Sequence, residues 1–161
     1  MHPLVEPGSM PENLQPGAAR TGEALLAAAA AASRQGRGRF STLGVGAAVL
    51  SVSGRLYSGC NVENSAYPLG SCAEMAAIAA GVLAEGEGFA IAEAAVWAGT
   101  AEGDPLPISP CGGCRQRISE LATGPDALVH FCWPAVEPCS MRIEDLLPCA
   151  FRLPAAGPSM P

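Results

Sequence analysis

Three cysteines and a glutamate occur at spacings that suit metal-assisted chemistry. Cys72 and Glu74 belong to Ser-Cys-Ala-Glu, and Cys111 and Cys114 to a later Pro-Cys-Gly-Gly-Cys. Both segments are expected to open a helix, where unpaired N–H groups and a positive potential favour the thiolate. Thiolates are good zinc ligands, and three protein ligands leave the fourth tetrahedral position open to water, as in catalytic sites. Glu74 would then lie beside that position without being a ligand itself.

Each part of this pattern also has a plainer interpretation. Ser71 and Glu74 have the spacing of a capping box, in which the glutamate only satisfies a backbone N–H group. Cys-x-x-Cys alone is also typical of a redox pair, or of half a structural zinc site with Cys60 as a further ligand. The combination is more specific, because a first cysteine ligand, a non-ligand glutamate and a later Pro-Cys-x-x-Cys form the signature of zinc-dependent deaminases.

The composition excludes several classes of function. The chain has 161 residues, 49% of them hydrophobic and 15% charged, which is the size of one domain with a single core. All nine basic residues are arginine, and the net charge of −6 argues against nucleic acid as a partner. The longest apolar run, residues 24–32, is far shorter than the roughly 20 residues that cross a bilayer. We therefore expect a protein that binds a small molecule and does not contact a membrane.

The same features favour a cytoplasmic location. The first residues have neither the basic start nor the apolar stretch of a signal peptide. The seven cysteines are therefore interpreted as thiols or metal ligands and not as a disulfide framework. His130, which lies in an apolar strand pattern, is expected to be a core residue and not a ligand.

The elements that must position these residues follow from the hydrophobic pattern. Residues 1–16 and 154–161 are expected to be flexible tails. The pattern predicts an α/β layered domain in which one mixed sheet is covered by helices. The predicted elements, in order, are a helix over 17–35, a β-hairpin that turns at Ser53-Gly54, a helix over 72–84 capped by Ser71, a strand over 91–99, a helix over 111–122 capped by Ser109, a strand over 127–133, and a short helix or turn over 141–147.

Over roughly residues 20–153 the chain resembles the cytidine deaminases, specifically the small homotetrameric type with three cysteine ligands. Beyond the metal motifs, the resemblance is carried by GVGAAVL, GCNVENSAY, PCGGCRQ and LLPCAF, in family order. It implies a three-layer α/β/α catalytic domain over residues 17–153, with a mixed central sheet of about five strands. It also implies one Zn²⁺ per subunit, held by Cys72, Cys111 and Cys114, and a homotetramer whose subunits share their active sites.

The activity implied by the resemblance is hydrolytic deamination of cytidine, and also of 2′-deoxycytidine, to uridine and ammonia in pyrimidine salvage. Zinc lowers the pKa of its bound water, and Glu74 carries protons to ring N3 and to the leaving amine. Asn61 and Glu63 of NVENSAY take the family's role of binding the ribose hydroxyls, since an amide and a carboxylate pair with the donors and acceptors of a diol. Tyr67 and Ala73 belong to the substrate-binding residues by the same resemblance.

Two positions depart from the family pattern. Met75 stands where many relatives have an arginine that offsets the charge of three thiolates, so two helix N-termini and Arg115 are expected to supply the compensation. Leu43 stands where an aromatic residue usually packs against the base, and it offers apolar surface without a ring face. Phe151 matches the aromatic residue that closes over the base from a neighbouring subunit.

Simpler interpretations stay open at this stage. Asn61 and Glu63 are also typical of a polar turn, Tyr67 of a partly buried tyrosine, Arg115 of a surface residue, and Phe151 of a core or C-terminal anchor residue. The closest rival activity is deamination of another aminopyrimidine nucleoside, such as blasticidin S, although the intact NVENSAY favours a ribose-binding site. The other rivals are a polynucleotide-editing deaminase and a non-catalytic zinc or redox protein.

Overall fold

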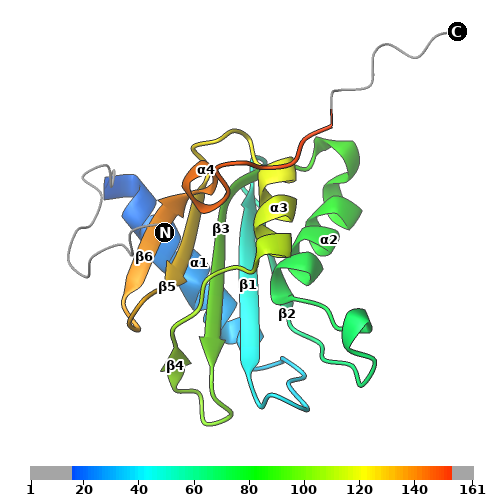
Figure 1. The fold of residues 1–161 in the computed structure, drawn as a ribbon. Coiled ribbons are helices and arrows are strands. Elements are labelled where there is room, and N and C mark those ends of the chain that lie inside the picture. The colour runs from blue at the N-terminus through cyan, green and yellow to red at the C-terminus, as the bar shows by residue number, and fades with distance from the viewer. Residues whose placement is uncertain (1–15, 154–161) are drawn as a thin grey trace, which may run out of the picture.

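A helix rich in alanine and leucine begins the described part of the chain. The computed structural model describes residues 16–153. α1 (Pro16–Ser33) consists mostly of strong helix formers, and it covers one face of the sheet (Figure 1). The two predicted tails lie outside the described residues, apart from residue 16, with which α1 begins.

One mixed sheet forms the centre of the molecule (Figure 1). Its strands pair in the order β2-β1-β3-β5-β6, and β4 pairs with the end of β3. Only the β3–β5 pair is parallel among the named strands, and the crossover that a parallel pair requires contains α3. The strands are β1 (Gly44–Ser51), β2 (Leu56–Cys60), β3 (Ile91–Gly99), β4 (Pro105–Leu106), β5 (Leu128–Cys132) and β6 (Pro138–Arg142).

Two further helices cover the opposite face of the sheet from α1 (Figure 1). They are α2 (Ala73–Glu85) and α3 (Gly112–Leu121). Because successive strand residues point to opposite faces, Ala47 and Val49 of β1 join the core on the α2 and α3 side, whereas Ala48 packs under α1. The predicted three-layer α/β/α arrangement with a mixed sheet is therefore confirmed. The hydrophobic pattern does not predict β4 or β6.

Glycines let both helix layers lie close to the β1–β2 hairpin. A Cβ atom at Gly46 would overlap the carbonyl oxygen of Ala29 in α1, and one at Gly59 would overlap the backbone nitrogen of Ala77 in α2. Only glycine permits so close an approach of two backbones. The position of α2, which begins directly after Cys72, therefore depends on the missing side chain at residue 59.

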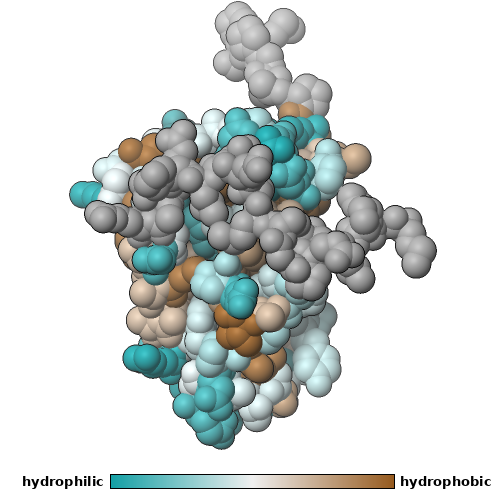
Figure 2. Space-filling view, turned by 90° about the vertical axis from the view of Figure 1, so that its left-hand side faces the viewer, coloured by the Kyte–Doolittle hydropathy of each residue, from teal (hydrophilic) through white to brown (hydrophobic). Residues whose placement is uncertain are grey.

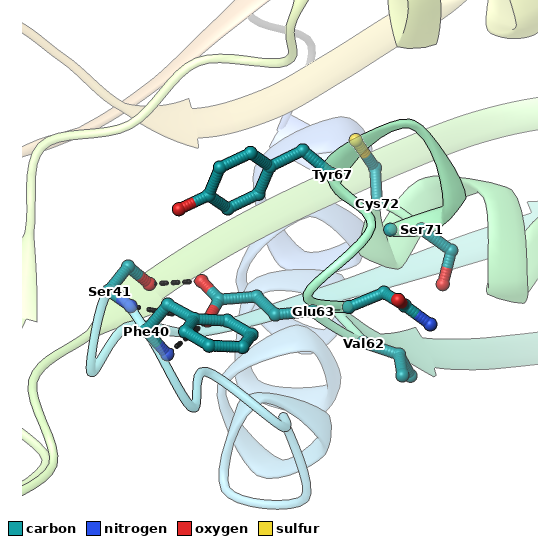
Figure 3. A pocket seen from close by; sticks show the side chains of 9 residues that line it. Phe40, Ser41, Val62, Glu63, Tyr67, Ser71 and Cys72 are labelled. Atoms are coloured by element: carbon teal, nitrogen blue, oxygen red, sulfur yellow. Dashed lines mark hydrogen bonds between the residues drawn. The ribbon is translucent and has the colours of Figure 1, made fainter.

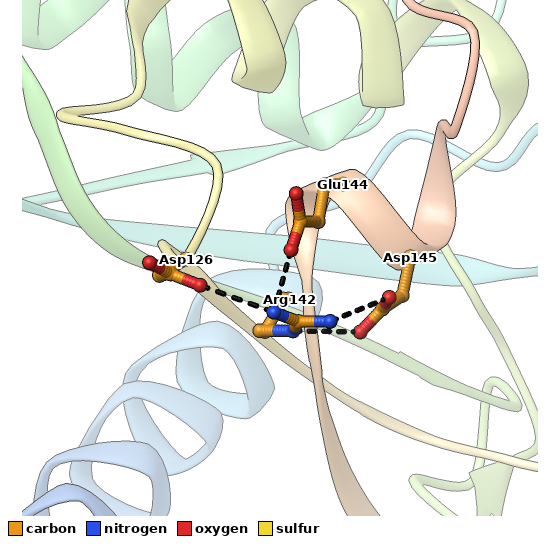
Figure 4. Close-up of polar contacts among 4 residues, drawn as sticks. All are labelled: Asp126, Arg142, Glu144 and Asp145. Atoms are coloured by element: carbon orange, nitrogen blue, oxygen red, sulfur yellow. Dashed lines mark hydrogen bonds and ion pairs between the residues drawn. The ribbon is translucent and has the colours of Figure 1, made fainter.

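A cluster of charges fixes the short helix α4 (Ile143–Leu146) at the end of β6. The Arg142 guanidinium donates to both carboxylate oxygens of Asp145, at 2.9 and 3.0 Å, and to Asp126 at 3.2 Å, and it pairs with Glu144 (Figure 4). The hydrogen bonds to Asp145 and Asp126 raise the pKa of Arg142 above its ordinary value. The cluster joins α4 to the loop before β5 and so fixes the segment that runs back toward α3.

The hydrophobicity of the helices and of the surface bears on whether the described chain can cross a bilayer. Within residues 16–153, no helix combines the length and the hydrophobicity needed to cross a bilayer. On the side of the molecule shown in Figure 2, hydrophobic residues outside the grey atoms occur in small groups among hydrophilic ones.

Candidate metal site

The N-termini of α2 and α3 bring three cysteines together. Cys72 and Cys111 are the N-cap residues of the two helices, with extended backbone, and Cys114 lies in the first turn of α3. The predicted caps, Ser71 and Ser109, are therefore wrong by one and two residues. Because both cysteines are N-cap residues, they lie at the positive ends of the two helices.

The spacing of the sulfur atoms fits a zinc ion. The three Sγ atoms lie within 4.8 Å of one another, and those of Cys72 and Cys111 are 3.9 Å apart. Ligands at about 2.3 Å from a tetrahedral zinc ion are about 3.8 Å apart, so three thiolates would occupy three of its corners. No other histidine, cysteine, aspartate or glutamate of the described residues joins this group, Cys60 included. The fourth corner is thus left to a ligand from outside the described protein.

The electrostatics of the cluster explain why a cation belongs at its centre. Burial raises the pKa of the Cys72 and Cys114 thiols, and the neighbouring negative charges of Cys111 and Glu74 raise it further. Burial also tends to raise the pKa of the Cys111 thiol. Hydrogen bonds from Cys114 and Cys72 outweigh this effect and lower the pKa below its ordinary value. Burial first, and then the repulsion between neighbouring negative charges, therefore opposes the ionisation of Cys72 and Cys114 in the absence of a cation. A divalent cation would remove that repulsion.

Glu74 is buried next to the sulfur atoms, with 5% of its surface exposed. Its carboxylate accepts hydrogen bonds from its own N–H group and from the Cys114 thiol. The capping-box interpretation is wrong, because the N–H group of Ser71 already donates to the carbonyl of Val62 at 2.9 Å. Burial raises the pKa of the Glu74 carboxyl, against the effects of these hydrogen bonds and of the positive charge of Arg117. A carboxyl group with a raised pKa is suited to accepting and releasing a proton near neutral pH.

A cavity of about 340 Å³, which we call the inner cavity, opens beside the cysteines. Its volume lies at the lower end of the range for small-molecule sites. It brings together most of the predicted site residues: Leu43, Asn61, Glu63, Cys72, Ala73, Glu74 and Cys111. The rest of its lining was not predicted and consists of Ser41, Val45, Ser71, Ile108 and Ser109. Ser71 and Ser109 are neighbours of the metal motifs in sequence, which is a signal that could have identified them.

Asn61 fixes the start of β1 at the edge of the inner cavity. Its Oδ1 accepts a hydrogen bond from the N–H group of Val45 at 2.9 Å, and its Nδ2 donates to the carbonyl of Leu43 at 3.1 Å. The side chain is buried, so it is not a solvated turn residue. An amide has one more donor and one more acceptor site than these two bonds use, which leaves capacity for a ligand in the cavity.

Glu63 holds the preceding loop in a similar way. Its carboxylate accepts hydrogen bonds from the Ser41 hydroxyl and from the N–H groups of Phe40, at 2.6 Å, and Ser41, at 3.2 Å. These bonds, that of the Ser41 hydroxyl above all, lower the pKa of Glu63. The carboxylate is therefore ionised at neutral pH and acts as an acceptor for any hydroxyl group nearby.

A second cavity of about 440 Å³, which we call the outer cavity, adjoins the first and shares Ser41, Glu63, Ser71 and Cys72 with it. Figure 3 shows the Glu63 side chain extended toward Ser41, with the Tyr67 ring across the space. Tyr67 is 79% exposed, so its interpretation as a partly buried tyrosine is wrong. Its ring contacts that of Phe40 edge-on, with centroids 6.3 Å apart.

Arg115 does not line either cavity. It contacts the segment that precedes Cys111. Its guanidinium donates to the carbonyl of Pro110 at 2.8 Å, to the carbonyl of Leu146 at 3.1 Å and to the hydroxyl of Ser109 at 3.2 Å. It is half-buried and is not a solvated surface residue. These bonds join the segment that leads into Cys111 to the end of α4.

We expect Arg115→Ala to lower metal retention and turnover together, each by about 10- to 100-fold, as for other groups that orient metal ligands. The loss of three hydrogen bonds would loosen residues 109–110 and hence the position of Cys111. The measurements are zinc content after dialysis against a chelator and kcat on the substrate, with Arg55→Ala as a control for loss of an exposed arginine. Unchanged metal content and rate would remove Arg115 from this account.

Phe151 lies on the C-terminal segment that crosses α3, also outside both cavity linings. Gln116 makes two hydrogen bonds with the backbone of Phe151. Its Nε2 donates to the Phe151 carbonyl at 2.7 Å, and its Oε1 accepts from the Phe151 N–H group at 3.1 Å. The side chain is 68% exposed, so Phe151 is not a core residue. Its backbone is anchored and its ring is presented to the surroundings.

The remaining candidates for chemistry lie apart from this site. His130 is buried, with its Nδ1 2.7 Å from the Ser140 hydroxyl and its Nε2 2.8 Å from the Glu93 carboxylate. Its prediction as a core residue is confirmed. All seven cysteines are free thiols in the structure.

Comparisons with known proteins agree with this geometry. The family model for the cytidine and deoxycytidylate deaminase zinc-binding region matches residues 19–132. The chain is 40% identical over 102 residues to the cytidine deaminase of Sporosarcina psychrophila, across 63% of this chain and 71% of the relative. It is 39% identical over 114 residues to the cytidine deaminase of Mycobacterium tuberculosis, and this match covers 71% of this chain and 77% of the relative. A crystal structure of cytidine deaminase from Burkholderia pseudomallei matches with a TM-score of 0.65 at 37% identity, over 80% of this chain and 98% of that one.

Proposed function

Because the chain belongs to the cytidine and deoxycytidylate deaminase family, we propose that it catalyses zinc-dependent hydrolytic deamination of cytidine and 2′-deoxycytidine. The products are uridine or 2′-deoxyuridine and ammonia, a reaction of pyrimidine salvage. The observation that carries the proposal is the meeting of three cysteine sulfur atoms and a buried glutamate at one cavity of small-molecule size.

Four residues of this chain perform the chemistry. Cys72, Cys111 and Cys114 would hold one zinc ion per chain, and the ion would supply an activated water molecule as the nucleophile. Glu74 accepts a proton from that water and donates it to ring N3, which makes C4 more electrophilic. As the water oxygen bonds to C4, Glu74 would move the second proton of that oxygen to the exocyclic amino nitrogen, and the C4–N bond would break to release ammonia. One water is consumed and one ammonia released, and the carboxylate ends in the state in which it began.

The inner cavity supports a nucleoside as the substrate. Asn61 and Glu63 would bind the ribose hydroxyls through the donor and acceptor sites that their loop contacts leave unused. Leu43 and Ala73 would contact the base with apolar surface, and Tyr67 would border the sugar from the outer cavity. A site of this kind rejects analogues that lack the hydroxyl, because its own polar groups would be left unpaired.

Charge favours an uncharged nucleoside over a nucleotide or a polynucleotide. The described residues that line the two cavities include Glu63 and Glu74 and neither lysine nor arginine. A 5′-phosphate or a phosphate backbone would meet only negative side chains there, in a chain whose net charge is −6.

An ammonia-release assay on a panel of substrates tests the proposal. Zinc-loaded protein is expected to turn over cytidine and 2′-deoxycytidine, and to act poorly on cytosine, which has no ribose, and on deoxycytidine 5′-phosphate. Activity on blasticidin S alone would favour the rival nucleoside deaminase, and binding of labelled single-stranded DNA at moderate salt would favour a polynucleotide substrate. Bound zinc with no loss of any aminopyrimidine would favour a structural metal protein.

We also propose that the chain forms a homotetramer with shared active sites, in the cytoplasm. Four large apolar side chains near the outer cavity and on the C-terminal segment are strongly exposed: Phe151 68%, Leu69 72%, Leu153 75% and Tyr67 79%. Each of these two pairs would be covered by a neighbouring subunit in such a tetramer, as exposed apolar side chains at interaction surfaces are. Seven free thiols are typical of a reducing compartment.

Phe151→Ala tests the shared site. If the ring closes over the base of a neighbouring subunit, the variant should raise KM about five- to thirtyfold, as for an interface aromatic residue, and change kcat less. Initial rates over a range of cytidine concentrations measure the split, and Leu153→Ala is the control for loss of an exposed side chain from the same segment. Activity that persists in a verified monomer would refute the shared site.

A further inference from the structure

Arg117 places a positive charge over the metal-binding turn of α3. Its Nη1 donates to the carbonyl of Gly113 at 2.9 Å, and Gly113 lies between Cys111 and Cys114. A Cβ atom on Gly113 would lie 3.1 Å from the same Nη1, so the guanidinium lies against Gly113, in the turn that carries both cysteines. The side chain is exposed and nevertheless folds back along the helix.

This position is unfavourable for a cation unless negative charge lies nearby. The N-terminal turn is the positive end of a helix, where a cation is destabilised and an anion is stabilised. Three thiolates around a divalent cation carry a net charge of −1. A guanidinium over residues 111–114 would offset part of this surplus.

The two arginines of this turn have different surroundings. Arg115 donates to Pro110, Leu146 and Ser109, so its hydrogen bonds serve the loop and α4. Arg117, by contrast, donates to the carbonyl of Gly113, so its guanidinium lies against the turn between Cys111 and Cys114. The sequence pattern assigned charge compensation to Arg115, and it gave no reason to single out Arg117.

We propose that Arg117 balances the charge of the metal site and thereby raises the affinity of the protein for its metal ion. The inference rests on the proposed metal site, within which Arg117 acts at a distance and touches neither metal nor substrate. Because the side chain is exposed, its effect is screened by salt. A residue that merely stabilised α3 through its hydrogen bond to Gly113 would show no such dependence.

The test is a competition for Zn²⁺ between the full chain and a chromophoric chelator, at about 0.05 M and about 1 M salt. Arg117→Gln removes the charge, Arg117→Lys keeps it, and Arg55→Gln removes an equal charge at the distant hairpin turn between β1 and β2. At low salt, Arg117→Gln is expected to weaken zinc binding about two- to fivefold. The difference should nearly vanish at high salt, where the Debye length is about 3 Å. Arg117→Lys and Arg55→Gln should bind zinc like the unmodified chain.

The outcomes separate this inference from the proposed function. Equal zinc affinity of the unmodified chain and Arg117→Gln at low salt would overturn it. So would a loss that is the same at both salt concentrations, or a loss of equal size in Arg55→Gln. If the unmodified chain itself fails to bind zinc, the proposed metal site is wrong and the inference falls with it.

Discussion

Glu74→Gln is expected to keep zinc at the level of the unmodified chain and to lower kcat on cytidine by about 10²- to 10⁴-fold, the usual contribution of a general acid–base group. The amide has nearly the shape of the carboxyl, so the buried position next to the cysteines should accept it without a change of fold. It cannot take up a proton from water and pass it to N3. Metal analysis and steady-state kinetics on the same preparation measure both effects.

Glu120→Gln is the matched control for this experiment. Glu120 lies on α3 and is exposed, so the same change there removes a carboxylate of the same helix layer without touching either cavity. It should leave kcat unchanged. Near-normal turnover by Glu74→Gln with zinc in place would rule out the proton-carrying role, whereas loss of zinc in that variant would show that Glu74 acts mainly on the metal.

Cys111→Ser is expected to reduce zinc from about one ion per chain to nearly none and to abolish measurable deamination. Cys111 supplies one of three sulfur ligands, and a hydroxyl is a far poorer zinc ligand than a thiolate. Because Cys111 is exposed at the N-terminus of α3, the exchange should leave the core intact. Removal of zinc from the unmodified chain with a chelator should also abolish activity. Added zinc should restore the activity of the unmodified chain but not that of Cys111→Ser.

Cys149→Ser provides the comparison, because Cys149 is equally a free, exposed thiol but does not belong to the sulfur cluster. It should keep both zinc and activity. Full zinc content in Cys111→Ser would contradict the three-cysteine site, and would point to ligands outside the described residues. Loss of zinc with retained activity would contradict the proposed chemistry and leave the metal a structural role.

Much of the fold and of the site could be predicted because the signals are local. The alanine-rich helix, the hairpin and the two helices that carry the metal motifs are each specified by a continuous run of residues. The choice of Cys72, Cys111 and Cys114 among seven cysteines follows from their spacing at two helix starts, and the structure brings these three together. β6 escaped prediction because residues 133–140 contain two prolines and no regular alternation, and its pairing with β5 depends on tertiary contacts.

The amino-acid order alone determined which side chains could act on a metal and a nucleoside, since helix propensity and motif spacing are properties of neighbouring residues. The packing of the sheet decided the rest: that Asn61 and Glu63 are tied to residues 40–45, and that Arg115 reaches the end of α4. These contacts join segments far apart in the chain. Such contacts exist only once the sheet order and the helix positions are fixed.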